Sequence, residues 1–182
     1  DDLGWEAAVQ AIAPDSHGLT VLPFVAGERS PGWRPNARAA ITGMTLTTTP
    51  AKVLRAGIEA VAYRLAEIYC RLPSEITTGR SIVASGGALR FTPWYQIISD
   101  VLGCAVEESL EQEASLRGAA IFAWRSLGAW KGCSDPPAAV GKVYEPDERR
   151  HRVYSEARER QRALYERLIP LWTEPGPSML GQ

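Results

Sequence analysis

Cysteine and histidine are scarce in this sequence, and their scarcity excludes several classes of protein. The three cysteines, Cys70, Cys104 and Cys133, form no CxxC or Cys/His pattern, which excludes a zinc motif and a disulfide framework. A reducing, cytoplasmic compartment is therefore expected. The two histidines, His17 and His151, have no partner at ligand spacing in the sequence. We interpret both as solvated surface side chains and expect no metal site.

Long hydrophobic runs and an excess of one charge are also missing. No apolar run approaches the roughly 20 residues that a membrane-spanning helix needs, and the first five residues do not resemble a signal peptide. The 20 Lys and Arg residues are scattered among 21 Asp and Glu residues, so no basic face is expected for anionic partners. We expect a soluble protein that binds neither nucleic acid nor a membrane.

What the sequence does contain is a regular alternation of apolar runs and helical periodicities. With 182 residues, 45% of them hydrophobic, the chain can bury one good core. Residues 1–170 are expected to form one domain, and residues 171–182 a flexible tail. Strands are predicted at residues 19–25, 39–46, 81–85 and 105–108, and helices at about 5–12, 50–71, 93–102, 115–127 and 147–168.

This order predicts an α/β domain, a mixed sheet flanked by helices on both faces. The first two strands are expected to belong to that sheet. The clearest helix starts at Pro50, and we expect its apolar residues to form the buried face. These residues are Leu54, Ile58, Val61, Leu65 and Ile68.

A Gly-Gly turn is the most informative local feature. Residues 82–88, Ile-Val-Ala-Ser-Gly-Gly-Ala, predict a buried strand that turns directly into a helix. Neither Gly86 nor Gly87 has a side chain, so the backbone can approach a ligand at the carboxyl end of the strand. A purely structural tight turn explains the same pair of glycines. No Lys-Ser/Thr follows, so this is not a Walker phosphate loop.

Several segments, taken in order, resemble the carboxyl-terminal part of the FGGY family of sugar kinases. The resemblance extends from about Leu19 to Leu168, and five ordered matches are far more specific than any one of them. The matching segments are residues 22–44, the helix 54–63, the turn and helix 85–103, residues 113–120 and residues 144–147.

The resemblance implies an actin-like, ribonuclease-H-like ATPase fold, here without its first strands, and ATP with Mg²⁺ as cofactors. It places the nucleotide near Ser85, Gly86, Gly87, Ala88 and Thr92. In this family the sugar, the catalytic aspartate and a Gly-Thr phosphate turn lie mainly upstream. We therefore expect no catalytic residue in this chain and no activity from the chain alone.

Two positions leave alternatives open. Phe91 replaces a small or polar residue that is common after the turn, which makes Thr92 the nearest polar substitute, although Thr92-Pro93 also predicts a helix N-cap. Glu28 and Arg29 lie in a loop rich in glycine and proline. They either order the edge of the cleft or pair with each other.

The substrate expected from the resemblance is a sugar or sugar acid, phosphorylated at a primary hydroxyl. Residues 22–24 and 27–31 and Trp33 look most like gluconate kinases, while xylulokinases share much of this pattern. A non-catalytic actin-like module that binds nucleotide or a protein partner is the alternative from another class. An exposed domain-closing face on a fragment would favour a homodimer.

Overall fold

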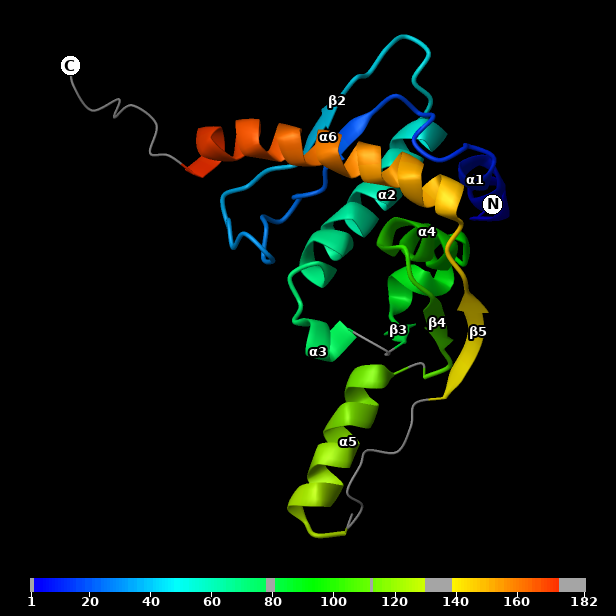
Figure 1. Ribbon diagram of the computed structural model, residues 1–182, viewed down its shortest axis with the longest axis vertical. Helices are drawn as coiled ribbons and strands as arrows, with labels where there is room; N and C mark the ends of the chain where they lie inside the picture. The colour runs from blue at the N-terminus through cyan, green and yellow to red at the C-terminus, as the bar shows by residue number, and fades with distance from the viewer. Residues whose placement is uncertain (1, 78–80, 112, 130–138, 174–182) are drawn as a thin grey trace, which may run out of the picture.

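The computed structural model describes residues 2–77, 81–111, 113–129 and 139–173 (Figure 1). Its elements in chain order are α1 (Asp2–Gln10), β1 (Thr20–Leu22), β2 (Ala40–Thr42), α2 (Pro50–Tyr69), α3 (Ser74–Thr77), β3 (Ile82–Ala84), η1 (Gly87–Arg90), α4 (Pro93–Leu102), β4 (Val106–Ser109), α5 (Ala114–Ser126), β5 (Val140–Tyr144) and α6 (Glu148–Thr173). The predicted alternation of strands and helices is confirmed, whereas α3 and β5 were not predicted.

The strands form two separate sheets. β1 and β2 pair antiparallel as a two-stranded sheet, and β3, β4 and β5 form a second sheet in that order. In the second sheet β3 and β4 are parallel, while β4 and β5 are antiparallel. The predicted mixed sheet is therefore confirmed. The expectation that the first two strands belong to it was wrong, because they pair only with each other in the described chain.

Helix α2 lies at the centre of the fold, but its buried face is not the predicted one. Thr49 caps the helix by accepting a hydrogen bond from the Lys52 N–H at 3.3 Å, and Pro50 occupies the first turn. Leu54 and Leu65 are 44% and 40% exposed. The buried residues of α2 are instead mainly small or charged, namely Arg55, Ala56, Glu59, Ala60, Ala62, Tyr63 and Ala66.

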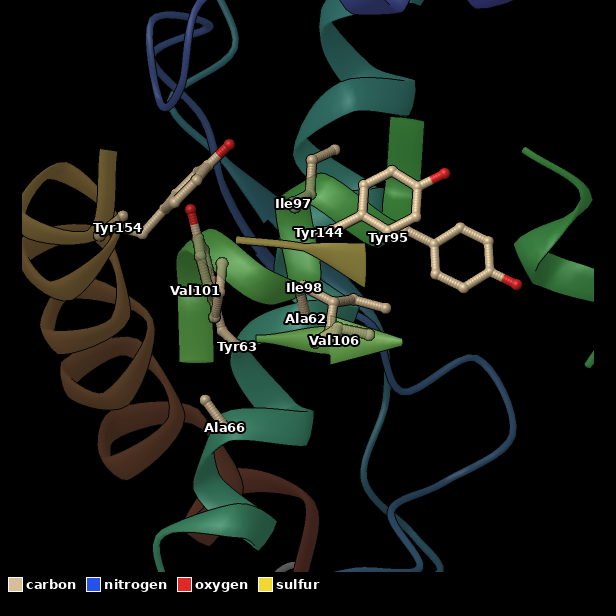
Figure 2. Close-up of a cluster of buried hydrophobic side chains, with 11 residues drawn as sticks. Ala62, Tyr63, Ala66, Tyr95, Ile97, Ile98, Val101, Val106, Tyr144 and Tyr154 are labelled. Carbon is tan, nitrogen blue, oxygen red and sulfur yellow. The ribbon is translucent and has the colours of Figure 1, made fainter. Parts of the chain in front are cut away.

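The main core lies where α2, α4 and α6 meet β4 and β5. Ile97 and Val101 of α4 are buried against α2, and Tyr154 approaches from α6 (Figure 2). The rings of Tyr63 and Tyr154 lie 6.0 Å apart, which ties α2 to α6. Alanines on α2 leave room for these larger side chains to interdigitate.

Helix α4 covers one face of the mixed sheet and ends where predicted. Gly103 adopts φ 70°, the left-handed conformation that favours glycine, and its N–H donates to the Ser99 carbonyl. On the opposite face Val83 and Val143 are paired across Glu107, and both are nearly half exposed. The second helical layer that we expected is absent from that face in the described part of the chain.

The last helices differ from prediction in their surroundings. α5 projects from the sheet end of the molecule (Figure 1), and Leu116 and Phe122 are exposed on it. α6 continues through Pro170 to Thr173, so residues 171–173 belong to the helix and not to the predicted tail. The rest of that tail, residues 174–182, lies outside the described residues.

Candidate functional site

The Gly-Gly turn follows the carboxyl end of β3 directly. Strand β3 ends at Ala84, Ser85 follows, and Gly87 opens the short helix η1. Gly86 has φ 120°, a conformation that side chains disfavour, whereas Gly87 does not have a positive φ. A Cβ atom added to either glycine would meet no protein atom within 4 Å. The backbone of the turn therefore borders open space, as close approach by a ligand requires.

A pocket of about 480 Å³ lies beside this turn. Gly86 and Gly87 form one side, Tyr95 of α4 and Arg90 of η1 add side chains, and Glu108 comes from the end of β4. The volume lies within the range of about 300–1,000 Å³ typical of ligand sites. Burial, followed by the nearby Glu108 carboxylate, raises the pKa of Tyr95. The pocket is therefore polar and acidic on its β4 side.

Of the five predicted nucleotide residues, the structure brings Gly86 and Gly87 to this pocket. Ser85 lines a different pocket, and the Ala88 side chain lies outside the described residues. Thr92 is exposed and is not among the residues that line the 480 Å³ pocket. The predicted N-cap role of Thr92 was also wrong, because its backbone is already helical and its side chain makes no capping bond.

The sequence did not indicate Arg90, Tyr95 or Glu108 as site residues. Arg90 and Tyr95 stand near the turn in sequence, but only the folded helices bring their side chains to the pocket. Glu108 stands 22 residues after Gly86 and reaches the pocket because β4 pairs with β3. The predicted strand at residues 105–108 was the one available signal for this neighbour.

The larger pocket, about 680 Å³, has a different character. It lies between α2, β3 and α4 and is lined mainly by aliphatic side chains such as Leu65, Ile68 and Ile82. The Trp94 indole N–H is buried at this pocket and has no hydrogen-bond partner in the described chain. Gly86 and Gly87 line the smaller pocket and not this one, so the smaller pocket is the better candidate for the nucleotide.

The two cleft-edge candidates, Glu28 and Arg29, have different environments. The Glu28 carboxylate is buried, forms an ion pair with Arg64, and accepts a hydrogen bond from the Tyr165 hydroxyl at 2.6 Å. The Arg64 guanidinium also lies over the rings of Phe24 and Tyr165. Arg29 is exposed. Glu28 thus connects the 27–36 loop to α2 and α6 through Arg64 and Tyr165, and it does not pair with Arg29.

His17 is not the solvated side chain that the sequence suggested. It is buried, its Nδ1 accepts from the Leu19 N–H at 3.0 Å, and its Nε2 therefore donates to Glu59 at 3.0 Å. His151 is half-buried, with its Nδ1 2.8 Å from the Asp100 carbonyl oxygen. Both histidines are held by internal hydrogen bonds.

Asp15, His17 and Glu59 place three potential metal ligands within 4.8 Å of one another. The Glu59 oxygens, however, already accept hydrogen bonds from the side chains of Arg55, His17, Tyr63 and Tyr154. Burial opposes ionisation of Glu59, but the hydrogen bond from His17 and the charge of Arg55 outweigh it and lower the pKa of Glu59. With both His17 nitrogens also engaged, the cluster is a filled hydrogen-bond network and does not fit a cation.

Comparison with known proteins identifies the domain. Residues 3–127 match the FGGY family of carbohydrate kinases, C-terminal domain, and this match covers more than half of the chain. The chain belongs to the FGGY family. The predicted family is thereby confirmed, and the Gly-Gly turn lies within the matched FGGY region.

Individual relatives carry several kinase names. The chain is 32% identical to a glycerol kinase of Gluconobacter oxydans (strain 621H) over 69% of its length, and 31% identical to a gluconokinase of Bacillus subtilis (strain 168) over 74%. It covers 25% and 26% of those proteins, about a quarter of their length. The FGGY relatives thus include at least two substrate specificities at nearly equal identity.

Solved FGGY structures share the fold. A gluconate kinase from Lactobacillus acidophilus superposes with TM-score 0.81 at 24% identity, covering 94% of this chain and 35% of that one. A xylulose kinase from Rhodospirillum rubrum gives TM-score 0.76 at 27% identity, covering 95% and 35%. The predicted actin-like fold class is confirmed by these matches. No described helix is long and apolar enough to cross a membrane.

Proposed function

We propose that this chain supplies the adenosine side of the ATP site in an FGGY carbohydrate kinase. The observation that carries the proposal is the Gly86-Gly87 turn, which follows β3 and opens on the 480 Å³ pocket. Ligands of open α/β sheets bind beyond the carboxyl ends of the strands, where this turn lies. The open space beside both glycines fits the adenosine of ATP, the phosphate donor that the family implies.

The reaction assigned to the full kinase is transfer of the γ-phosphoryl group of ATP to a primary hydroxyl of a sugar or sugar acid. Such transfer depends mainly on positioning and on neutralising phosphate charge. The cluster of Asp15, His17 and Glu59 does not fit Mg²⁺, since Glu59 and His17 are engaged by internal hydrogen bonds. We therefore assign no metal ligand and no catalytic base to this chain. We propose that the chain alone does not catalyse phosphoryl transfer.

Gluconate is the favoured substrate, with xylulose as the alternative. Residues 22–24 and 27–31 and Trp33 resemble gluconate kinases, and a gluconokinase is among the relatives by sequence. A non-catalytic nucleotide-binding module is the second candidate function, because the nucleotide pocket is on this chain whereas a catalytic base is expected outside it. Sugar contacts are expected mainly from sequence outside this chain.

A phosphoryl-transfer assay on the full-length polypeptide tests the proposal. ATP is supplied with gluconate, xylulose or glycerol, and sugar-dependent ADP release is measured for the full polypeptide and for this chain alone. We expect turnover by the full polypeptide, fastest with gluconate, and none by this chain. Turnover by the chain alone would refute the division of roles, and ATP binding without turnover by the full polypeptide would favour the non-catalytic module.

A further inference from the structure

Glu108 stands at the same level of the sheet as the start of the Gly-Gly turn. β3 and β4 are parallel neighbours, and Glu108 is paired in register with Ala84, the last residue of β3. The carboxyl ends of the two strands therefore meet at one edge. Both Glu108 and the two glycines line the 480 Å³ pocket.

The Glu108 carboxylate has unused capacity to accept hydrogen bonds. It is half-buried, and no donor contacts it in the described part of the chain. Its neighbour Glu111 differs, because the Arg117 guanidinium at 3.2 Å and the Ala139 N–H at 3.4 Å already engage it. Carboxylates that lose solvent contact are stable when donors replace the water, so a ligand entering this pocket must present donors to Glu108.

The charge of the pocket decides which part of a nucleotide fits. Besides Glu111, two carboxylates, Glu108 and Glu113, line it together with the single guanidinium of Arg90. A phosphate group would be repelled by the carboxylates, whereas ribose hydroxyls are neutral donors. In dinucleotide-binding sheets, a Gly-rich turn follows one strand, and an acidic residue about 20 residues later accepts from the ribose hydroxyl.

We propose that Glu108 is a specificity-determining residue that accepts hydrogen bonds from the 2′- and 3′-hydroxyls of a ribonucleoside. Glu108 follows Gly86 by 22 residues and stands on the neighbouring parallel strand. The acidic residue and the glycine turn are therefore spaced here as they are in dinucleotide-binding sheets. The inference rests on the proposed function, because the nucleoside is the adenosine of the nucleotide held by the Gly-Gly turn. It adds that the site requires a ribose and selects against deoxyribonucleosides.

The test compares adenosine with 2′-deoxyadenosine and 3′-deoxyadenosine in calorimetric titrations of this chain. Because a hydrogen bond to a charged group is being removed, the unmodified protein should bind adenosine about tenfold or more tightly than either deoxy compound. Glu108→Gln, which removes the charge and keeps one acceptor oxygen, should reduce that preference. It should weaken binding of adenosine more than binding of either deoxy compound, because each deoxy compound has only one of the two hydroxyls. The matched control is Glu107→Gln, which removes the same charge one residue away, on the opposite side of the strand.

The possible outcomes separate this inference from the proposed function. Equal binding of adenosine and both deoxy compounds by the unmodified protein overturns the role of Glu108. So does a ribose preference that is undiminished in folded Glu108→Gln. If adenosine binding is abolished by Gly87→Val in either case, the proposed site itself stands. If adenosine does not bind at all, both the inference and the proposed site fail.

Discussion

Glu59 holds three separate segments of the chain together. From α2 it accepts hydrogen bonds from Arg55 on its own helix, from His17 in the loop after α1, and from Tyr154 on α6. Its side chain is fully buried, so it needs all of these donors to stay ionised. The carboxylate therefore fixes how α2, α6 and the loop that leads into β1 meet.

Glu59→Gln should destabilise the fold at neutral pH by about 3–5 kcal/mol, because it leaves the buried Arg55 guanidinium uncompensated. The folded pKa of Glu59 is below its ordinary value of 4.5, so its contribution is present above that value. The difference between the two proteins should shrink as the pH falls from 4.5 through the folded pKa. Urea denaturation between pH 3 and 7 measures it, and a difference that does not change with pH would contradict the account.

Glu28 and Arg29 give a second test at this scale, because they are adjacent but differ in burial. Glu28→Gln should cost about 3–5 kcal/mol, since it breaks a buried ion pair and leaves Arg64 unpaired. Arg29→Gln changes an exposed side chain and should stay within about 0.5 kcal/mol of the unmodified protein. Thermal or urea unfolding measures the stability of both variants. Equal stabilities would mean that Glu28 does not stabilise the fold, and its role at the edge of the cleft would remain the alternative.

The site was only partly predictable from the sequence at the level of residues. Gly86 and Gly87 were found because a Gly-Gly pair after an apolar strand is a local signal. Glu108 reaches the same pocket through strand pairing, which local sequence does not encode. His17 was misassigned for a similar reason, because its partner Glu59 lies 42 residues further along the chain.

Helix α2 illustrates what can and cannot be predicted at the scale of elements. Its existence and its start at Pro50 followed from the helical period and the Thr49-Pro50 cap. Its buried face did not, because the large aliphatic residues weighed most in the pattern while the core of this domain uses alanines. β5 was missed because its first residues, Val140 and Gly141, lie at the end of a segment rich in glycine and proline.

Truncation of a buried side chain should therefore cost more stability than truncation of a partly exposed one. Ile97→Ala on α4 removes a side chain that is 3% exposed and should cost about 2–5 kcal/mol. Leu65→Ala on α2, where the side chain is 40% exposed, should cost less than about 1 kcal/mol. Urea unfolding at equal protein concentration compares them. A Leu65→Ala cost as large as that of Ile97→Ala would mean that the predicted apolar face is the buried one.

At the scale of the whole molecule, the chain has the carboxyl-terminal domain of an FGGY kinase and spans about a quarter of its curated relatives' length. Its candidate nucleotide pocket lies at the carboxyl edge of the β3–β4 pair. The ion pairs of Glu59 and Glu28 lie on α2 and the surfaces that pack on it, outside this pocket. Nucleotide binding and fold stability should therefore be separable by mutation.

A calorimetric titration of ATP into this chain and its Gly87→Val variant tests the central claim most directly. Gly87 has no positive φ, and a Cβ there meets no protein atom within 4 Å, so valine should leave the fold intact while occupying ligand space. We predict binding by the unmodified chain and about five- to a hundred-fold weaker binding by the variant, equivalent to roughly 1–3 kcal/mol. Gly57→Val, at an equally open position on α2, is the control and should keep ATP affinity. Unchanged affinity in a folded Gly87→Val protein would contradict the account and leave the Gly-Gly pair as a structural turn.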